Sequence, residues 1–78
     1  MVHLMNKSEL DVAYFISFCI EQYKKKNSMQ GREVMELFDR YGVLQYLSEH
    51  FEILHTQSWQ WIMEDIDHYI TIRKEKQQ

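Results

Sequence analysis

The feature of this sequence that most restricts its fold is the scarcity of residues that interrupt helices. The 78 residues contain no proline and only two glycines, Gly31 and Gly42. Proline and glycine are the strongest local interruptions of regular structure, so long segments run without one. The longest segment, residues 8–26, ends before Asn27. Its β-branched and aromatic interior also suits a buried strand, but strands average about 5–6 residues, so the length favours a helix.

The predicted helix over residues 8–26 is apolar on two sides. At about 3.6 residues per turn, one stripe consists of Val12, Phe15, Ile16, Cys19 and Tyr23. Leu10, Tyr14 and Phe18 recur every fourth residue on the opposite side. A helix that is apolar on both sides needs cover on both sides. We therefore expect this helix either to be central in its own fold or to contact a partner chain.

Three further helices are predicted after Asn27. The second covers residues 31–41, with an inward stripe of Val34, Leu37, Phe38 and Tyr41. The third is short, from Leu44 to about His50, and residues 51–55 form an irregular or extended link. The last helix carries its inward stripe at Trp59, Ile62, Met63, Ile66, Tyr69, Ile70 and Arg73, with Trp61, Asp65 and Ile72 partly off it. The fold class is thus all-α, a compact bundle of three long helices and one short one.

Short polar residues mark the expected helix ends. The candidate N-caps are Ser8, with Asp11 three residues later, Gln30 with Glu33 or else Ser28, and Thr56 or Ser58. Gly42 is suited to the left-handed conformation that ends a helix, with Val43 folding back onto Phe38. The chain ends, residues 1–7 and 74–78, are expected to fray.

Length and composition predict one small domain over residues 1–78, with a core of modest size. The single cysteine, Cys19, excludes an intrachain disulfide. No secretory signal is apparent and the apolar run at residues 12–20 is too short to span a membrane, so a cytoplasmic location is expected. Cys19 lies on the apolar stripe and is expected to be buried and inert.

The charge distribution argues against nucleic acid as a partner. The formal net charge is −3, and the basic clusters at residues 24–26 and 73–76 fall at predicted helix ends, where they favour the helix dipole. A helix-turn-helix around Gly42 is a weak alternative, because its recognition segment, residues 44–50, carries no lysine or arginine.

The polar residues that could carry chemistry are few. A metal-binding or enzymatic role around His55, Glu64 and His68 is a second alternative, since Glu64 and His68 are neighbours on one helix face. The sequence lacks the paired motifs of di-metal bundles, a nucleophile elbow and a phosphate-binding loop. We therefore predict no catalytic residue, no metal ligand and no cofactor.

Aromatic side chains are abundant, at 14% of the chain, and a core of this size holds only part of them. Tyrosine and tryptophan are enriched in protein interfaces. We therefore predict a non-enzymatic protein-interaction module, forming a homodimer or binding another protein. The predicted interaction surface consists of Leu10, Tyr14, Phe18, Trp61 and Ile72.

Four segments of the chain resemble a family of small bacterial proteins known as domain of unknown function 3791. These are FCIEQYK at 18–24, GREVMELFDRYGVL at 31–44, LHTQ at 54–57 and EDID at 64–67. The resemblance covers roughly residues 12–70. It implies a small cytoplasmic protein, often encoded near ADP-ribosyltransferase-like proteins, which suggests an operon-encoded partner and an antitoxin or accessory role.

The family's polar signature outside the helix interiors is His55, Thr56 and Gln57. We interpret it chiefly as the start of a helix, with Thr56 as the cap and His55 bonded locally, and keep a binding site as the alternative.

Overall fold

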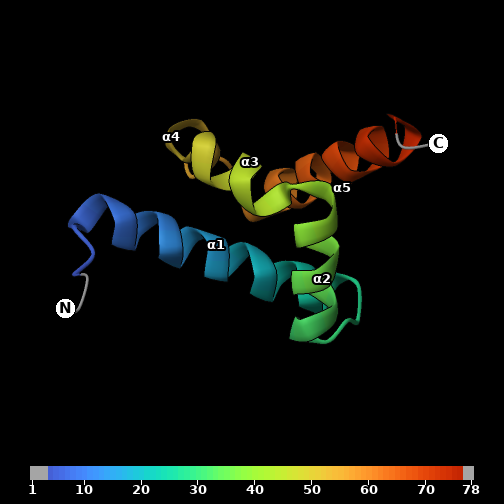
Figure 1. Ribbon diagram of the computed structural model, residues 1–78, viewed down its shortest axis with the longest axis horizontal. Helices are drawn as coiled ribbons and strands as arrows, with labels where there is room; N and C mark the ends of the chain where they lie inside the picture. Colours follow the sequence, from blue (N-terminus) through green and yellow to red (C-terminus); the bar gives the residue numbers. More distant parts are fainter. Residues whose placement is uncertain (1–3, 77–78) are drawn as a thin grey trace.

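The computed structural model describes residues 4–76, and these form five α-helices without a strand. The helices are α1 (Lys7–Lys26), α2 (Gly31–Tyr41), α3 (Val43–Glu49), α4 (Phe51–Leu54) and α5 (Trp59–Lys76). The predicted all-α class is confirmed. Figure 1 shows α1 along one side of the molecule and α3, α4 and α5 on the other, with α2 crossing near the C-terminal end of α1.

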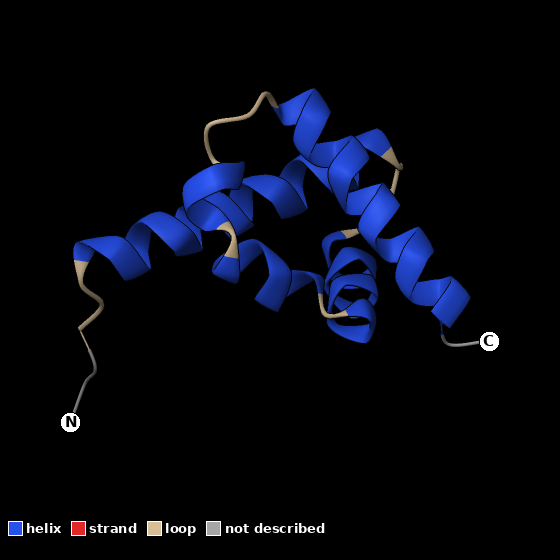
Figure 2. Cartoon of the chain, turned by 90° about the horizontal axis from the view of Figure 1, so that it is seen from above, coloured by secondary structure: helices blue, strands red, loops and turns tan. Residues whose placement is uncertain are grey.

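The helices surround a single hydrophobic core. Its buried side chains come from all five helices: Phe15, Cys19, Tyr23, Val34, Phe38, Tyr41, Val43, Leu47, Leu54, Ile62, Met63, Ile66 and Ile70. α1 packs against α2, α3 and α5. The N-terminal turns of α1 nevertheless extend past the other helices, and the C-terminal end of α5 lies at the opposite end of the molecule (Figure 2).

Capping residues set where α1 begins and α2 begins. The cap of α1 is Asn6, whose side-chain Oδ1 accepts the backbone N–H of Glu9 at 2.8 Å, so the prediction of Ser8 was wrong. Either residue supplies a suitable oxygen, but only Asn6 is followed by a glutamate three residues later. α2 begins after Gln30, whose backbone N–H donates to Glu33 Oε1 at 2.9 Å, rather than after Ser28.

The predicted stop at Gly42 is confirmed. Gly42 has φ 71° and ψ 24°, and its N–H is bonded to the carbonyls of Phe38 and Asp39. α3 begins at the next residue, Val43, which is fully buried. A residue with a Cβ is strained at this φ, so the sharp change of direction between α2 and α3 depends on glycine.

The segment predicted as an irregular or extended link is instead one helical turn, α4. Leu54 and His55 donate their backbone N–H groups to His50 and Phe51 at 2.9 Å. Helical spacing directs Leu54 into the core and places the Phe51 ring edge-on to Phe15, with 5.5 Å between centroids. An extended segment would point these two side chains, three residues apart, to opposite sides.

The chain ends are more regular than predicted. Lys7 and residues 74–76 are helical, and residues 4–6 are not. The remaining residues of the predicted frayed ends, 1–3 and 77–78, lie outside the described part. The last turns of α1 and α5 carry Lys24, Lys25 and Lys26, and Arg73, Lys74 and Lys76, as predicted. Their positive charges stabilise the negative ends of the helix dipoles.

Candidate interaction surface

α1 presents three apolar side chains away from the core. Tyr14 is 72% exposed, and Leu10 and Phe18 are each 41% exposed. They follow one another at four-residue spacing, which places them along one side of the helix. We call these three residues the outer face of α1. Among residues 4–76, neither Tyr14 nor Phe18 stacks on another ring.

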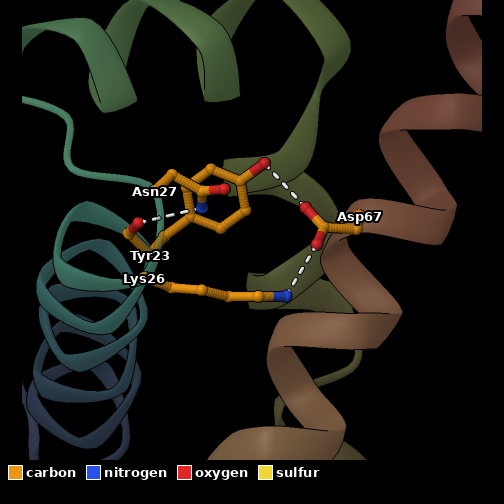
Figure 3. Close-up of polar contacts among 4 residues, drawn as sticks. All are labelled: Tyr23, Lys26, Asn27 and Asp67. Carbon is orange, nitrogen blue, oxygen red and sulfur yellow. Dashed lines mark hydrogen bonds and ion pairs between the residues drawn. The ribbon is translucent and has the colours of Figure 1, made fainter.

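The opposite side of α1 is fixed by specific contacts. The ring of Tyr23 packs edge-on against Phe38, with 5.1 Å between centroids. Its hydroxyl donates to Asp67 Oδ1 of α5 at 2.7 Å, and Lys26 Nζ donates to Asp67 Oδ2 at 2.8 Å. Figure 3 shows both bonds together with the side chain of Asn27, which donates to the Tyr23 carbonyl. These contacts set the rotation of α1, so its outer face stays turned to solvent.

The environment of Tyr23 also changes its acidity. Burial of the ring raises the pKa of the hydroxyl above its usual value, and the hydrogen bond to the Asp67 carboxylate raises it further. Both effects disfavour a negative charge at this position. Tyr23 is therefore a neutral hydrogen-bond donor that joins α1 to α5.

Charged residues lie at both ends of the outer face. Lys7 and Glu21 are each seven residues from Tyr14, on the same side of the helix. Lys7 forms no ion pair within residues 4–76. Glu21 lies 3.5 Å from Lys24, and its side chain is half exposed. The outer face is thus basic at its N-terminal end and acidic toward its C-terminal end.

Trp59 extends this surface at the C-terminal end of α1. The sequence placed Trp59 on the inward stripe of the last helix, but its side chain is 45% exposed. It occupies the first turn of α5, where it lines a shallow hollow with Gln22, Lys25 and Lys26. Helical periodicity gives the direction of a side chain but not whether the neighbouring helices extend far enough to cover it.

Trp61 and Ile72, the other members of the predicted surface, lie on α5 and are 44% and 37% exposed. Their spacing puts them on one side of α5, away from its buried residues. α1 and α5 pack against each other through their inner sides. The outer face of α1 and the Trp61–Ile72 side therefore face away from each other, and the five predicted residues form two surfaces.

A second cluster of aromatic and charged residues, missed at the sequence level, joins α3 to α5. The ring of Tyr46 stacks on Tyr69, with 4.2 Å between centroids, and its hydroxyl donates to Asp65 Oδ2 at 2.6 Å. The Arg73 guanidinium lies 5.5 Å from the centroid of the Tyr69 ring. Arg73 is exposed, whereas the sequence placed it on the inward stripe. Burial and the bond to Asp65 raise the pKa of Tyr46 to about 12.

Only part of this cluster had a sequence signal. The spacing of Tyr69 and Arg73 predicts that they are neighbours on one helix face. Their contact with Tyr46 depends on how α3 crosses α5, which the sequence pattern does not give. A hollow beside the cluster is lined by Gly42, Gln45, Glu49 and His50 as well.

The polar segment His55, Thr56 and Gln57 ends α4 rather than starting α5. Thr56 Oγ1 donates to the Ile53 carbonyl at 2.8 Å, and the His55 ring stacks on Phe51 at 4.4 Å. The hydroxyl that caps α5 is that of Ser58, which accepts the backbone N–H of Trp61 at 3.2 Å. Of the two caps considered, Ser58 is confirmed and Thr56 is wrong.

The residues of the metal or enzymatic alternative are not gathered into a site. Within residues 4–76, no group of three or more histidine, cysteine, aspartate or glutamate side chains is placed to hold a metal ion. His55 stacks on Phe51 in the connection before α5, whereas Glu64 and His68 are exposed on α5. Cys19 is fully buried, as predicted, and burial raises the pKa of its thiol to about 12, which keeps it protonated.

None of the helices in residues 4–76 combines the length and the apolar character that crossing a lipid bilayer requires. In comparison with known protein families, a model described as a protein of unknown function, DUF3791, matches residues 14–73, which is more than half of the chain. No curated protein and no solved structure matches it.

Proposed function

The chain belongs to the DUF3791 family, whose function is unknown, and from its surface we propose that it is a non-enzymatic protein-interaction module. In this proposal the binding surface is the outer face of α1, defined by Leu10, Tyr14 and Phe18. The proposal keeps the predicted function and narrows the predicted surface, because Trp61 and Ile72 lie on another side of the molecule.

One observation carries the proposal: Tyr14, at 72% exposure, lies between two further exposed apolar side chains on a single helix face. Single exposed apolar residues are common on soluble proteins, but a continuous row of them is characteristic of a contact site. Tyrosine and phenylalanine are also enriched among the residues that dominate binding energy.

The surface is preformed. Tyr23, Lys26 and Asp67 hold the opposite side of α1 against α5, so the outer face has a fixed orientation before any partner binds. A preformed helix face loses little conformational entropy on binding, which favours affinity from a small area. An apolar stripe at this spacing fits the groove or helix of another protein.

Two classes of partner are consistent with such a surface. One is a second copy of the chain, and the other is a different protein with an apolar groove. The family resemblance suggests an operon-encoded protein of the ADP-ribosyltransferase type for the second class, with this chain acting as an antitoxin-like or accessory subunit. Both remain predictions, as do the cytoplasmic location and the absence of nucleic acid from the partners.

Site-specific photocrosslinking in the producing cells tests the proposal. A photoreactive amino acid at position 14 is compared with the same amino acid at Arg32 of α2, whose side chain is 88% exposed and lies off the outer face. We expect a discrete adduct from position 14, identified by mass spectrometry and reproduced with the purified partner. Equal adduct patterns at positions 14 and 32, or none at 14, would contradict the proposal.

A further inference from the structure

We propose that the protein bound at the outer face of α1 is a second copy of this chain, packed with the two α1 helices antiparallel and a twofold axis at Tyr14. The inference rests on the proposed function and identifies the partner. A closed twofold dimer is the commonest assembly of soluble proteins, and it requires a surface complementary to itself. The outer face of α1 has this property in both its apolar and its charged residues.

The apolar residues are arranged symmetrically about Tyr14. Leu10 precedes Tyr14 by four residues and Phe18 follows it by four, and both are 41% exposed. In an antiparallel pair centred on Tyr14, residues at equal distances before and after it lie opposite each other. Leu10 of each copy therefore meets Phe18 of the other, and the two Tyr14 rings meet at the axis.

The charges select this orientation. Lys7 and Glu21 lie seven residues before and after Tyr14, so an antiparallel pair brings Lys7 of each copy to Glu21 of the other. A parallel pair would place lysine opposite lysine and glutamate opposite glutamate. Lys7 forms no ion pair within residues 4–76, and Glu21 is only loosely paired with Lys24 at 3.5 Å, so both are available. Such charge patterns fix the orientation of paired helices more than they add affinity.

Trp59 adds to the area of the contact. It lies beside Gln22 and Lys26, at the end of α1 that an antiparallel arrangement places next to the N-terminal segment of the second copy. Leu4 in that segment is 84% exposed. With these residues added to the outer face, the contact buries on the order of 1,000 Å² in total, which is typical of a weak dimer with micromolar affinity.

Sedimentation velocity over a concentration series measures the dimer dissociation constant and tests the arrangement with charge variants. Lys7→Glu alone and Glu21→Lys alone each place like charges opposite one another twice, so we expect the dissociation constant to rise about tenfold in each. The double variant, Lys7→Glu with Glu21→Lys, recreates both opposite-charge pairs and is expected to return it to within about threefold of the original value.

Arg32→Glu is the matched control, because it makes the same change of charge in the first turn of another helix. We expect it to leave the dissociation constant unchanged. Lys7 is likewise in the first turn of its helix, where glutamate favours the helix dipole, so both variants should fold. Helical circular dichroism and a urea transition verify this for every variant.

The outcomes separate this inference from the proposed function. A wild-type chain that stays monomeric at about a hundred micromolar, or single variants that dimerise as well as the wild type, would overturn the antiparallel dimer. Failure of the double variant to recover would also overturn it. If position 14 then still crosslinks to one different protein, the proposed function stands without self-association. If position 14 crosslinks to nothing, both are wrong.

Discussion

The inner and outer sides of α1 carry similar residues in opposite circumstances. On the inner side, Phe15 packs edge-on against Phe51, and Tyr23 packs against Phe38 while its hydroxyl is bonded to Asp67. On the outer side, Tyr14 is 72% exposed and stacks on no ring within residues 4–76. The comparison teaches that residue type alone does not separate the two roles. The inner rings hold the fold together, and the outer rings are free to contact another molecule.

The largest effect is expected from removing a ring that the inner side packs against. Phe38 is fully buried against Tyr23, so Phe38→Ala should lower the free energy of unfolding by about 3–5 kcal/mol. A core of this size supplies about the same amount, so the variant should be largely unfolded. Circular dichroism in urea measures this, with Met35→Ala, which removes a 43% exposed side chain of α2, as the control. A folded Phe38→Ala variant would contradict the inner-side packing.

The next effect concerns the polar contact between α1 and α5. Asp67→Ala leaves the Tyr23 hydroxyl and the Lys26 amine without their partner and is expected to cost about 2 kcal/mol. Tyr23→Phe removes one hydrogen bond without leaving the hydroxyl unpaired and should cost about 1 kcal/mol. The double variant measured by urea unfolding should cost less than the sum. Full additivity would show that the two side chains do not interact.

A smaller and graded loss of stability is expected at high pH. The pKa of Tyr46 is raised to about 12 by burial and by its bond to Asp65, and the pKa of Tyr23 is raised for the same reasons. In the unfolded chain both titrate near pH 10. The folded state therefore binds these protons more tightly, and its advantage is complete below about pH 10 and lost as the pH rises toward about 12.

Urea midpoints measured between about pH 8 and pH 12 test this dependence. Tyr46→Phe removes one of the two groups, so its stability should fall less steeply with pH than that of the unmodified chain. An identical slope in both proteins would show that Asp65 does not hold the Tyr46 proton in the folded state.

The smallest effect on stability is expected on the outer side. Tyr14→Lys removes an exposed ring from the middle of α1 and should change the free energy of unfolding by less than about 0.5 kcal/mol at concentrations where the chain is monomeric. The same change should reduce binding of a dye specific for exposed apolar surface. A large loss of stability would mean that Tyr14 belongs to the fold, and the distinction between the two sides would fail.

The sequence predicted what local spacing controls. It identified the fold class, the Gly42 stop, buried Cys19, and the outer position of Leu10, Tyr14 and Phe18, because helical periodicity assigns each residue a direction. It failed where the outcome depends on the arrangement of other helices. Trp59 has the direction of a core residue, but α5 begins beyond the cover of its neighbours.

The same reason explains the other misses. The stacking of Tyr46 on Tyr69 requires α3 to cross α5 at one height, and no residue pattern encodes that. Residues 51–54 are too short for helical periodicity to be visible, although Leu54 and Phe51 become helical when the core offers them a place. The grouping of Trp61 and Ile72 with the outer face failed because direction on one helix says nothing about direction on another.

The joint at Gly42 constrains how the length of this chain can vary. A single residue separates α2 from α3, so one inserted residue would turn α3 by about 100° around its axis and carry Tyr46 away from Tyr69. Residues 55–58 are exposed and connect two helices without such a dependence. Natural insertions, and engineered tags or reporter peptides, should therefore be accommodated between α4 and α5 and rejected between α2 and α3.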